Sequence, residues 1–272
     1  MKEIAGLLLD KKELSRCKKV IEESIRDTVK ECSCRGVVLG ISGGVDSAVV
    51  LKLAHGAGVD VHALIMPEEG MTRERDVEDA MRMAQDLGIK YSVIKINPIL
   101  AALESAFPWS DFPAEKKRLS LGNAKARVRM VLNYLAANLD NRLVLGTGNR
   151  TEILLGYATK YGDGGVDMQP IGDLYKTQVL QMAEYVGVPE RIIRKVPTAG
   201  LWKGQTDEGE LGASYREMDM ILHFLVDRKT TVSKTAKELS VDEKVVERLS
   251  MRIAANVHKI KAPPVTKLFN QA

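Results

Sequence analysis

Two stretches of this sequence place glycine, hydroxyl and carboxylate side chains in patterns that suit phosphate chemistry. The first is residues 42–47, SGGVDS, which follows an apolar, β-branched run ending at Gly40 and precedes apolar residues on a helical period. This pattern predicts a strand, a glycine turn and a helix N-terminus. The free N–H groups of such a helix end attract anions. Glycine at 43 and 44 would let the backbone approach a phosphate closely.

Asp46 is the most informative residue of this stretch. A carboxylate beside a phosphate site repels the ligand unless a divalent cation lies between them. The stretch is neither a Walker A loop, which continues Gly-Lys-Ser/Thr, nor the dinucleotide-binding G-x-G-x-x-G. An ordinary capped turn between a strand and a helix is the alternative, and the combination of two glycines with Asp46 and two serines disfavours it.

The second stretch, residues 146–178, begins directly after another apolar run. Glu152 supplies a second carboxylate, which could share a Mg²⁺ with Asp46. The lysines of this stretch could neutralise phosphates, and its acids could bind a substrate hydroxyl or an ammonium ion. A solvated loop would explain the glycines but not this density of charge, which comes from Lys160, Asp163, Asp167 and Lys176.

The elements that must position these side chains follow from the alternation of apolar patterns. We expect strands at 36–40, 59–66, 90–96 and 142–147, and helices at 14–34, 45–56, 72–87, 122–139, 213–227, 231–239 and 241–259. This order predicts a doubly wound, mostly parallel Rossmann-like α/β sheet flanked by helices, with C-terminal helices. Ligands bind beyond the carboxyl ends of such strands, where both stretches fall. Residues 107–119 and 200–212 are expected to be loops, the second closing over the site.

One long helix has a predicted apolar face and two arginines beside it. The face consists of Ala124, Val128, Val131, Leu132, Leu135 and Leu139. Arg127 and Arg129 lie off this face, so either they are solvated or they contact an anionic ligand or a second subunit.

Composition limits the class of protein. A chain of 272 residues with 45% hydrophobic and 28% charged residues is typical of a soluble globular protein. The net charge of +4 is too small to indicate nucleic-acid binding, and no stretch is long and apolar enough for a membrane span or a signal peptide. Three cysteines disfavour a disulfide framework. We therefore expect a cytoplasmic protein without a nucleic-acid or membrane partner.

Residues 42–47 resemble the PP-loop of ATP pyrophosphatases, and four further motifs resemble the NAD synthetase family. These motifs are GTGNRTE at 146–152, TKYGDGGVD at 159–167, PTAGLWKGQTDEGELG at 197–212, and His258-Lys259 before two prolines. They occur in the family's order and cover most of residues 20–265. The family often continues with arginine where this chain has Ile260, so Lys261 is the alternative basic contact there.

The resemblance implies one domain over residues 1–272, with an adenine nucleotide alpha hydrolase-like PP-loop core at about 20–200 and a helical part at about 213–260. It also implies the reaction. ATP adenylates the nicotinate carboxylate of deamido-NAD (nicotinic acid adenine dinucleotide) and releases pyrophosphate. Ammonia then displaces AMP to give NAD.

The resemblance also implies roles for individual residues. The ATP phosphates would be held by Gly40, Ile41, Ser42, Gly43, Gly44, Val45, Asp46 and Ser47, with other ATP contacts from Thr147, Lys176 and Thr198. Mg²⁺ would bind to Asp46 and Glu152, and deamido-NAD would contact Arg127, Lys160, Asp163, Asp167, His258 and Lys259. The catalytic residues would be Asp46, Asp163 and Lys176. Asp163 would hold ammonium and help it to lose a proton, or would only bind substrate.

The nitrogen donor is expected to be ammonia, because the chain has neither room nor a cysteine motif for a glutaminase. A separate glutaminase subunit is the alternative source. Related chains are homodimers with a shared deamido-NAD site, so Arg127 and His258 are expected near an interface. Two other function classes remain: a different PP-loop synthetase, such as a GMP synthetase-like subunit, and a non-catalytic adenine-nucleotide-binding module.

Overall fold

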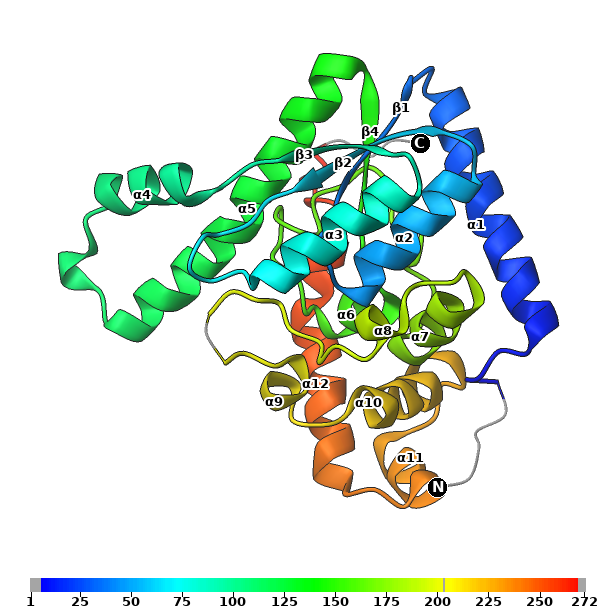
Figure 1. The fold of residues 1–272 in the computed structure, drawn as a ribbon. Helices are drawn as coiled ribbons and strands as arrows, with labels where there is room; N and C mark the ends of the chain where they lie inside the picture. Colours follow the sequence, from blue (N-terminus) through cyan, green and yellow to red (C-terminus); the bar gives the residue numbers. More distant parts are fainter. Residues whose placement is uncertain (1–5, 203, 269–272) are drawn as a thin grey trace.

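A parallel sheet lies at the centre of the computed structural model, which describes residues 6–202 and 204–268 (Figure 1). Its strands in this part of the chain are β1 (Gly36–Gly40), β2 (Asp60–Ile65), β3 (Lys90–Val93) and β4 (Arg142–Leu145), in the order β3-β2-β1-β4. All three pairings are parallel. The chain therefore winds outward from β1 in both directions, as predicted for a doubly wound sheet.

Helices cover both faces of this sheet (Figure 1). Val37 and Leu39 of β1 belong to the core cluster that includes side chains of α1 (Lys11–Glu31), α2 (Val45–Gly56), α3 (Glu74–Asp86), α7 (Lys176–Tyr185) and α8 (Glu190–Ile193). Val38 faces the opposite cluster, beneath α4 (Asn97–Ala106) and α5 (Ala114–Asp140). The three valine and leucine side chains are fully buried, as expected for a strand covered on both faces.

The C-terminal helices form a third cluster with α6 (Arg150–Leu155). These helices are α9 (Asp207–Leu211), α10 (Tyr215–Leu222), α11 (Val232–Leu239) and α12 (Glu243–Ile260), with a π-helical turn at His223–Asp227. α10 packs on both α6 and α7, and α12 packs on α6. The C-terminal helices thus support the two elements that follow β4.

Several predicted boundaries are wrong. Residues 107–119 are not an irregular loop, because a 3₁₀ turn at Trp109–Asp111 leads into α5, which begins at Ala114. Residues 200–212 contain α9. Strands predicted to reach 96 and 147 end at Val93 and Leu145, although single backbone hydrogen bonds continue at Ile94 and Gly146.

The predicted apolar face of α5 is only partly buried. Val128 is buried, but Val131, Leu135 and Leu139 are 57%, 56% and 79% exposed. These three apolar side chains therefore form an open stripe on the helix. Among the described residues, no helix is both long and apolar enough to cross a bilayer.

Candidate active site

The loop between β1 and α2 is organised by its own hydroxyl groups. Ser47 Oγ donates a hydrogen bond to the carbonyl oxygen of Gly44 (3.0 Å) and accepts one from the N–H of Ser42 (3.2 Å). The N–H of Gly44 donates to Ser42 Oγ (3.2 Å). Gly43 has a positive φ of 79°, and a Cβ there would lie 2.2 Å from the carbonyl oxygen of Asp76. Glycine is therefore required at 43 by both conformation and space.

Asp46, near the start of α2, meets residues from the elements that follow β4. Asp46 Oδ2 lies 2.5 Å from Lys176 Nζ, and Asp46 Oδ1 accepts a hydrogen bond from Asn149 Nδ2 (3.0 Å). The order β3-β2-β1-β4 makes β1 and β4 neighbours, so their carboxyl ends bring these segments together. The structure thus brings together Asp46 and Lys176, two of the residues predicted for the site.

Asn149 also positions Glu152. Its side chain accepts a hydrogen bond from the N–H of Glu152 (3.0 Å), and Glu152 Oε2 accepts one from the N–H of Asn149 (3.1 Å). This is a capping box at the start of α6. Asn149 was not predicted as a site residue, although its spacing from Glu152 is a capping-box signal.

The charged groups of Asp46, Glu152 and Lys176 affect one another's ionisation. Burial and the neighbouring carboxylate of Asp46 raise the pKa of Glu152 to about 8. Lys176 is only 2% exposed. Burial opposes its charge, but Asp46 and Glu152 outweigh burial and hold its pKa above the usual value. Lys176 therefore stays an ammonium ion, while Glu152 binds a proton easily.

The acid pair Asp46–Glu152 fits a Mg²⁺ ion that also binds substrate phosphates. Within the described ranges, no group of three or more His, Cys, Asp or Glu residues is placed to hold a metal ion. Mg²⁺ commonly takes only one or two carboxylates, with phosphates and waters completing its shell. Burial, and after it the negative charge of Asp46, raise the pKa of Glu152, and a divalent cation would relieve the second of these effects.

A buried carboxylate from α10 ties the two helix starts together. Asp219 is fully buried and accepts a hydrogen bond from Thr151 Oγ1 (2.5 Å). It also accepts bonds from the N–H and Oγ1 of Thr177 (both 2.8 Å). Thr151 precedes Glu152, and Thr177 follows Lys176. Asp219 therefore fixes the relative position of the acid and the ammonium, although no sequence motif singled it out.

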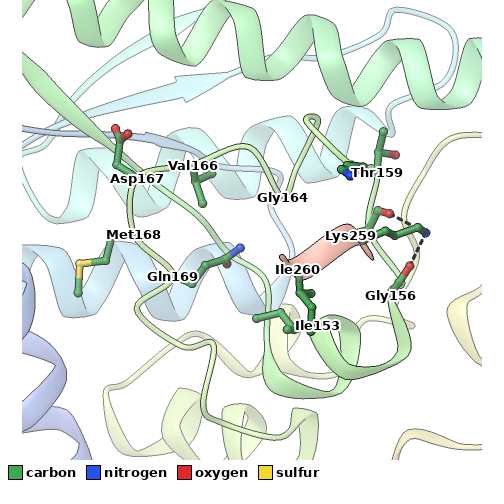
Figure 2. A pocket seen from close by; sticks show the side chains of 12 residues that line it. Ile153, Gly156, Thr159, Gly164, Val166, Asp167, Met168, Gln169, Lys259 and Ile260 are labelled. Carbon is green, nitrogen blue, oxygen red and sulfur yellow. Dashed lines mark hydrogen bonds between the residues drawn. The ribbon is translucent and has the colours of Figure 1, made fainter. Parts of the chain in front are cut away.

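The structure also contains a cavity of about 290 Å³, lined by residues of α6, of the loop that follows it and of the end of α12 (Figure 2). Lys160, Asp167 and Lys259, all predicted to bind substrate, line it. Lys259 Nζ donates to the carbonyl oxygens of Gly156 (2.6 Å) and Ala158 (3.1 Å), so it also secures the C-terminal end of α6.

Asp167 is anchored by two hydrogen bonds to its carboxylate. Its Oδ2 accepts from the N–H of Val144 (2.8 Å), and its Oδ1 accepts from the hydroxyl of Tyr134 (2.9 Å). The residue therefore lies beside β4 at a fixed position. Burial and the hydrogen bond to Asp167 raise the pKa of Tyr134 to about 12, so this tyrosine keeps its proton.

The other residues predicted for the site make individual hydrogen bonds or lie next to the elements already described. Arg127 Nη2 donates to the carbonyl oxygen of Lys160 (3.2 Å), which links α5 to the cavity. Asp163 Oδ1 accepts from the N–H of Thr159 (2.8 Å), so it closes a turn. Thr198 Oγ1 accepts from the N–H of Gly200 (3.1 Å). His258 precedes Lys259 on α12, and Thr147 follows β4.

Asp207 holds the segment before α9 against the site. It is 4% exposed and accepts hydrogen bonds from the hydroxyls of Tyr157 (3.0 Å) and Tyr215 (2.9 Å) and from the N–H of Ala199 (2.9 Å). Burial and the two acids Asp207 and Glu210 keep the hydroxyl of Tyr157 protonated by raising its pKa. The motif at 197–212 contained Asp207, but sequence analysis gave it no role.

Comparison with known proteins identifies the family. A family model described as NAD synthase matches residues 17–263. The chain belongs to the NAD synthase family. It is 47% identical over 255 residues to the NH(3)-dependent NAD(+) synthetase of Archaeoglobus fulgidus, covering 92% of this chain and 97% of that one. It is also 47% identical over 262 residues to the Methanosarcina mazei enzyme of the same name, covering 94% and 100%.

Solved structures of the family share the fold. An NMN synthetase from Francisella tularensis superposes with a TM-score of 0.81 at 34% identity, covering 94% of this chain and 99% of that one. An NH3-dependent NAD synthetase from Campylobacter jejuni gives 0.78 at 32% identity, covering 96% and 100%. These comparisons confirm the predicted NAD synthase family, the α/β fold and the class of ligase that forms a carbon–nitrogen bond, with ATP as co-substrate. NAD synthesis by ATP-dependent amidation is confirmed as the family's function.

Proposed function

We propose that this chain amidates deamido-NAD with ammonia, using ATP and Mg²⁺. The observation that carries this proposal is the meeting of Asp46, Glu152 and Lys176 beside the glycine loop after β1. The comparisons support ammonia as the nitrogen donor, because the relatives that match along nearly the whole chain are named NH(3)-dependent.

The proposed chemistry converts the nicotinate carboxylate, a poor electrophile, into an acyl-adenylate, which is a good one. A carboxylate oxygen of the nicotinate attacks the α-phosphorus of ATP, and the bond from that phosphorus to the bridging oxygen breaks, releasing pyrophosphate. The nitrogen lone pair of ammonia then attacks the carboxyl carbon. The bond from this carbon to the AMP oxygen breaks, and one proton leaves the nitrogen.

The residues of the centre would stabilise the charges that develop. Lys176, a buried ammonium, would neutralise the leaving pyrophosphate. Bound between Asp46 and Glu152, Mg²⁺ would screen the phosphate charge. The N–H groups of residues 40–47 would bind phosphate oxygens, with Thr147 and Thr198 as further ATP contacts.

The cavity lined by the loop after α6 and the end of α12 would bind deamido-NAD. Lys160, Asp167 and Lys259 line it, and Arg127 contacts the backbone of Lys160. His258 would complete the basic side of this site. Asp163 would hold the ammonium ion and accept its proton, and its position in the turn that lines the cavity supports this role.

We also propose a homodimer. The stripe of Val131, Leu135 and Leu139 on α5 supports it, because these side chains are more than half exposed and a second copy could cover them. Arg127 lies on the same helix. The protein would act in the cytoplasm, as one functional unit in which the helical part at 213–260 supports the core at 20–200 through the packing of α10 on α6 and α7.

A coupled assay tests the proposed activity. Purified protein is given ATP, Mg²⁺ and deamido-NAD with either ammonium chloride or glutamine, and NAD is measured. We expect NAD with ammonium only. Product from glutamine alone would contradict ammonia as the direct donor, and no product with either donor would contradict the proposed activity.

A mononucleotide is the second candidate acceptor. The similarity to an NMN synthetase, at 34% identity and a TM-score of 0.81, favours testing it. The same assay is therefore run with nicotinic acid mononucleotide, and its amide, NMN, is measured in place of NAD. A higher kcat/KM for the mononucleotide than for deamido-NAD would replace the proposed substrate while keeping the chemistry.

A further inference from the structure

A cluster of charged side chains lies behind the glycine loop and has no part in the chemistry described above. Its centre is Lys195, which follows α8 and precedes Thr198 by three residues. Lys195 Nζ donates to the carbonyl oxygen of Gly43 (2.9 Å) and to Asp76 Oδ1 (2.6 Å), and it lies 2.7 Å from Asp79 Oδ2. The two acids lie on α3. One ammonium thus joins the glycine loop, α3 and the segment that leads to Thr198.

The contact with Gly43 fixes the orientation of one peptide group. In a trans peptide, the C=O of one residue and the N–H of the next point in opposite directions. The carbonyl of Gly43 points to Lys195, so the N–H of Gly44 points away from Lys195. That N–H lies at the N-cap of α2, inside the loop, where it donates to Ser42 Oγ. We infer that Lys195 is a positioning residue that holds the phosphate-binding face of the loop in place.

The glycine loop is packed against α3, and this packing limits the position of the loop. A Cβ on Gly43 would lie 2.2 Å from the carbonyl oxygen of Asp76, so the loop already lies directly against the first turn of α3. Sterics limit movement of the loop toward α3, but they do not choose which way the Gly43 carbonyl points. The hydrogen bond from Lys195 makes that choice.

The charge of Lys195 is balanced within the cluster. Burial opposes ionisation of Asp79, but its bonds with Lys195 and Arg191 hold its pKa below the usual value. Arg191 Nε lies 2.6 Å from Asp79 Oδ1, and Arg73 Nε lies 3.1 Å from Asp76 Oδ2. Two acids therefore face three cations. Because Lys195 is paired with both acids, its role is to orient the loop rather than to supply charge to a phosphate.

Arg191 offers a matched control. Arg191 Nε lies 2.6 Å from Asp79 Oδ1, and Lys195 Nζ lies 2.7 Å from Asp79 Oδ2, so both cations contact the same carboxylate at similar distances. Arg191 also connects α8 to α3. A purely structural salt bridge would make both cations equivalent. A positioning role predicts that only Lys195 affects phosphate binding.

The test measures binding of pyrophosphate and of AMP to the full chain by calorimetry, with Mg²⁺ present, for the wild type, K195M, K195R and R191M. We expect K195M to bind pyrophosphate about tenfold or more weakly, with a similar rise in the KM for ATP. AMP affinity should change by less than about twofold, because AMP lacks the phosphates that the loop holds. K195R keeps the charge and the N–H donors, so it should stay within about fivefold of wild type. R191M should bind pyrophosphate like the wild type.

Two results would overturn the inference: wild-type pyrophosphate affinity in K195M, or equal losses in K195M and R191M at equal urea stability. If K195M does not fold, K195Q carries the same test, since its amide keeps a donor without the charge and should give an intermediate loss. The inference rests on the proposed function. A wild-type protein that binds neither ATP nor pyrophosphate would contradict that function itself, and this is distinguishable from a loss confined to the variants.

Discussion

Lys176 Nζ lies 2.5 Å from Asp46 Oδ2, and these two groups come from the first turns of two different helices, α7 and α2. The side chain of Lys176 is 3% exposed and that of Asp46 is 18% exposed. Removing either partner of so buried an ion pair would destabilise the protein, because the other group would remain as a buried charge without a counter-charge. The pair therefore couples the glycine loop to the segment after β4.

Replacing Lys176 with methionine should lower kcat by about 100-fold or more, because the developing charge on pyrophosphate loses its buried cation. The measurement is the steady-state rate of pyrophosphate release with saturating ATP, deamido-NAD and ammonium. K176R is the control, since it retains the charge and should keep more activity than K176M. A kcat for K176M within threefold of wild type would refute this role.

The raised pKa of Glu152 predicts how stability depends on pH. In the ligand-free folded protein, Glu152 keeps its proton up to about pH 8, whereas its ordinary pKa is 4.5. The folded state therefore binds more protons between these values, and the free energy of unfolding falls as pH rises through this window. Urea unfolding at pH 5.5 and pH 8.5 measures the fall.

The E152Q variant and Mg²⁺ serve as controls for this effect. In E152Q the free energy of unfolding should fall less between pH 5.5 and pH 8.5 than in the wild type. At pH 8.5 it should be higher than that of the wild type by roughly 1–3 kcal/mol. Mg²⁺ with ATP should also reduce the fall in the wild type, because a cation favours the charged acid. An identical pH slope in wild type and E152Q would show that another group is responsible.

Asp219 should affect activity through the positions of Glu152 and Lys176. D219N replaces a carboxylate that accepts three hydrogen bonds, so it should destabilise the protein by about 1–3 kcal/mol and lower kcat by about tenfold. It should also shift Mg²⁺ activation to higher concentrations. T177S keeps the hydroxyl and should behave like the wild type. Loss of stability with unchanged kcat and Mg²⁺ dependence would leave Asp219 with a structural role only.

The exposed stripe on α5 predicts the effect of a charge at its centre. L135D should convert the proposed dimer to a monomer, because an aspartate would be desolvated in the interface. Sedimentation velocity measures the change. V20D on α1 is a matched control, since Val20 is 55% exposed and Leu135 is 56% exposed. A wild-type protein that is already monomeric would contradict the proposed dimer.

The fold and the central acid–lysine site were predictable because their signals are local. Alternating apolar runs predicted the parallel sheet, and glycine-rich segments after β1 and β4 placed Asp46 and Glu152 at strand ends that the topology brings together. Lys176 was predicted from the charged stretch at 146–178, but its contact with Asp46 was not. Asp219 and Lys195 were not predicted, because each is an ordinary polar residue whose partners are far away in the sequence. Only the packing of α10 and α8 reveals their contacts.

The differences at residues 107–119 and on α5 have another physical cause. Pro108 and Pro113 favoured a loop at 107–119, but Pro113 is the N-cap residue of α5, and proline is well tolerated where a helix begins. The apolar residues Val131 and Leu139 were predicted to share one face of the helix because of their spacing. Spacing does not show whether the chain itself covers that face.

Transfer of an isotopic label tests the proposed reaction most directly. Deamido-NAD carrying ¹⁸O in its nicotinate carboxylate is incubated with the protein, ATP, Mg²⁺ and ammonium, and the products are analysed by mass spectrometry. Attack of the carboxylate on the α-phosphorus predicts one ¹⁸O in AMP, none in pyrophosphate and one in the NAD amide. Label in a phosphate released from the β or γ position, or NAD formed without labelled AMP, would contradict the proposed adenylate and the role of the loop at 42–47.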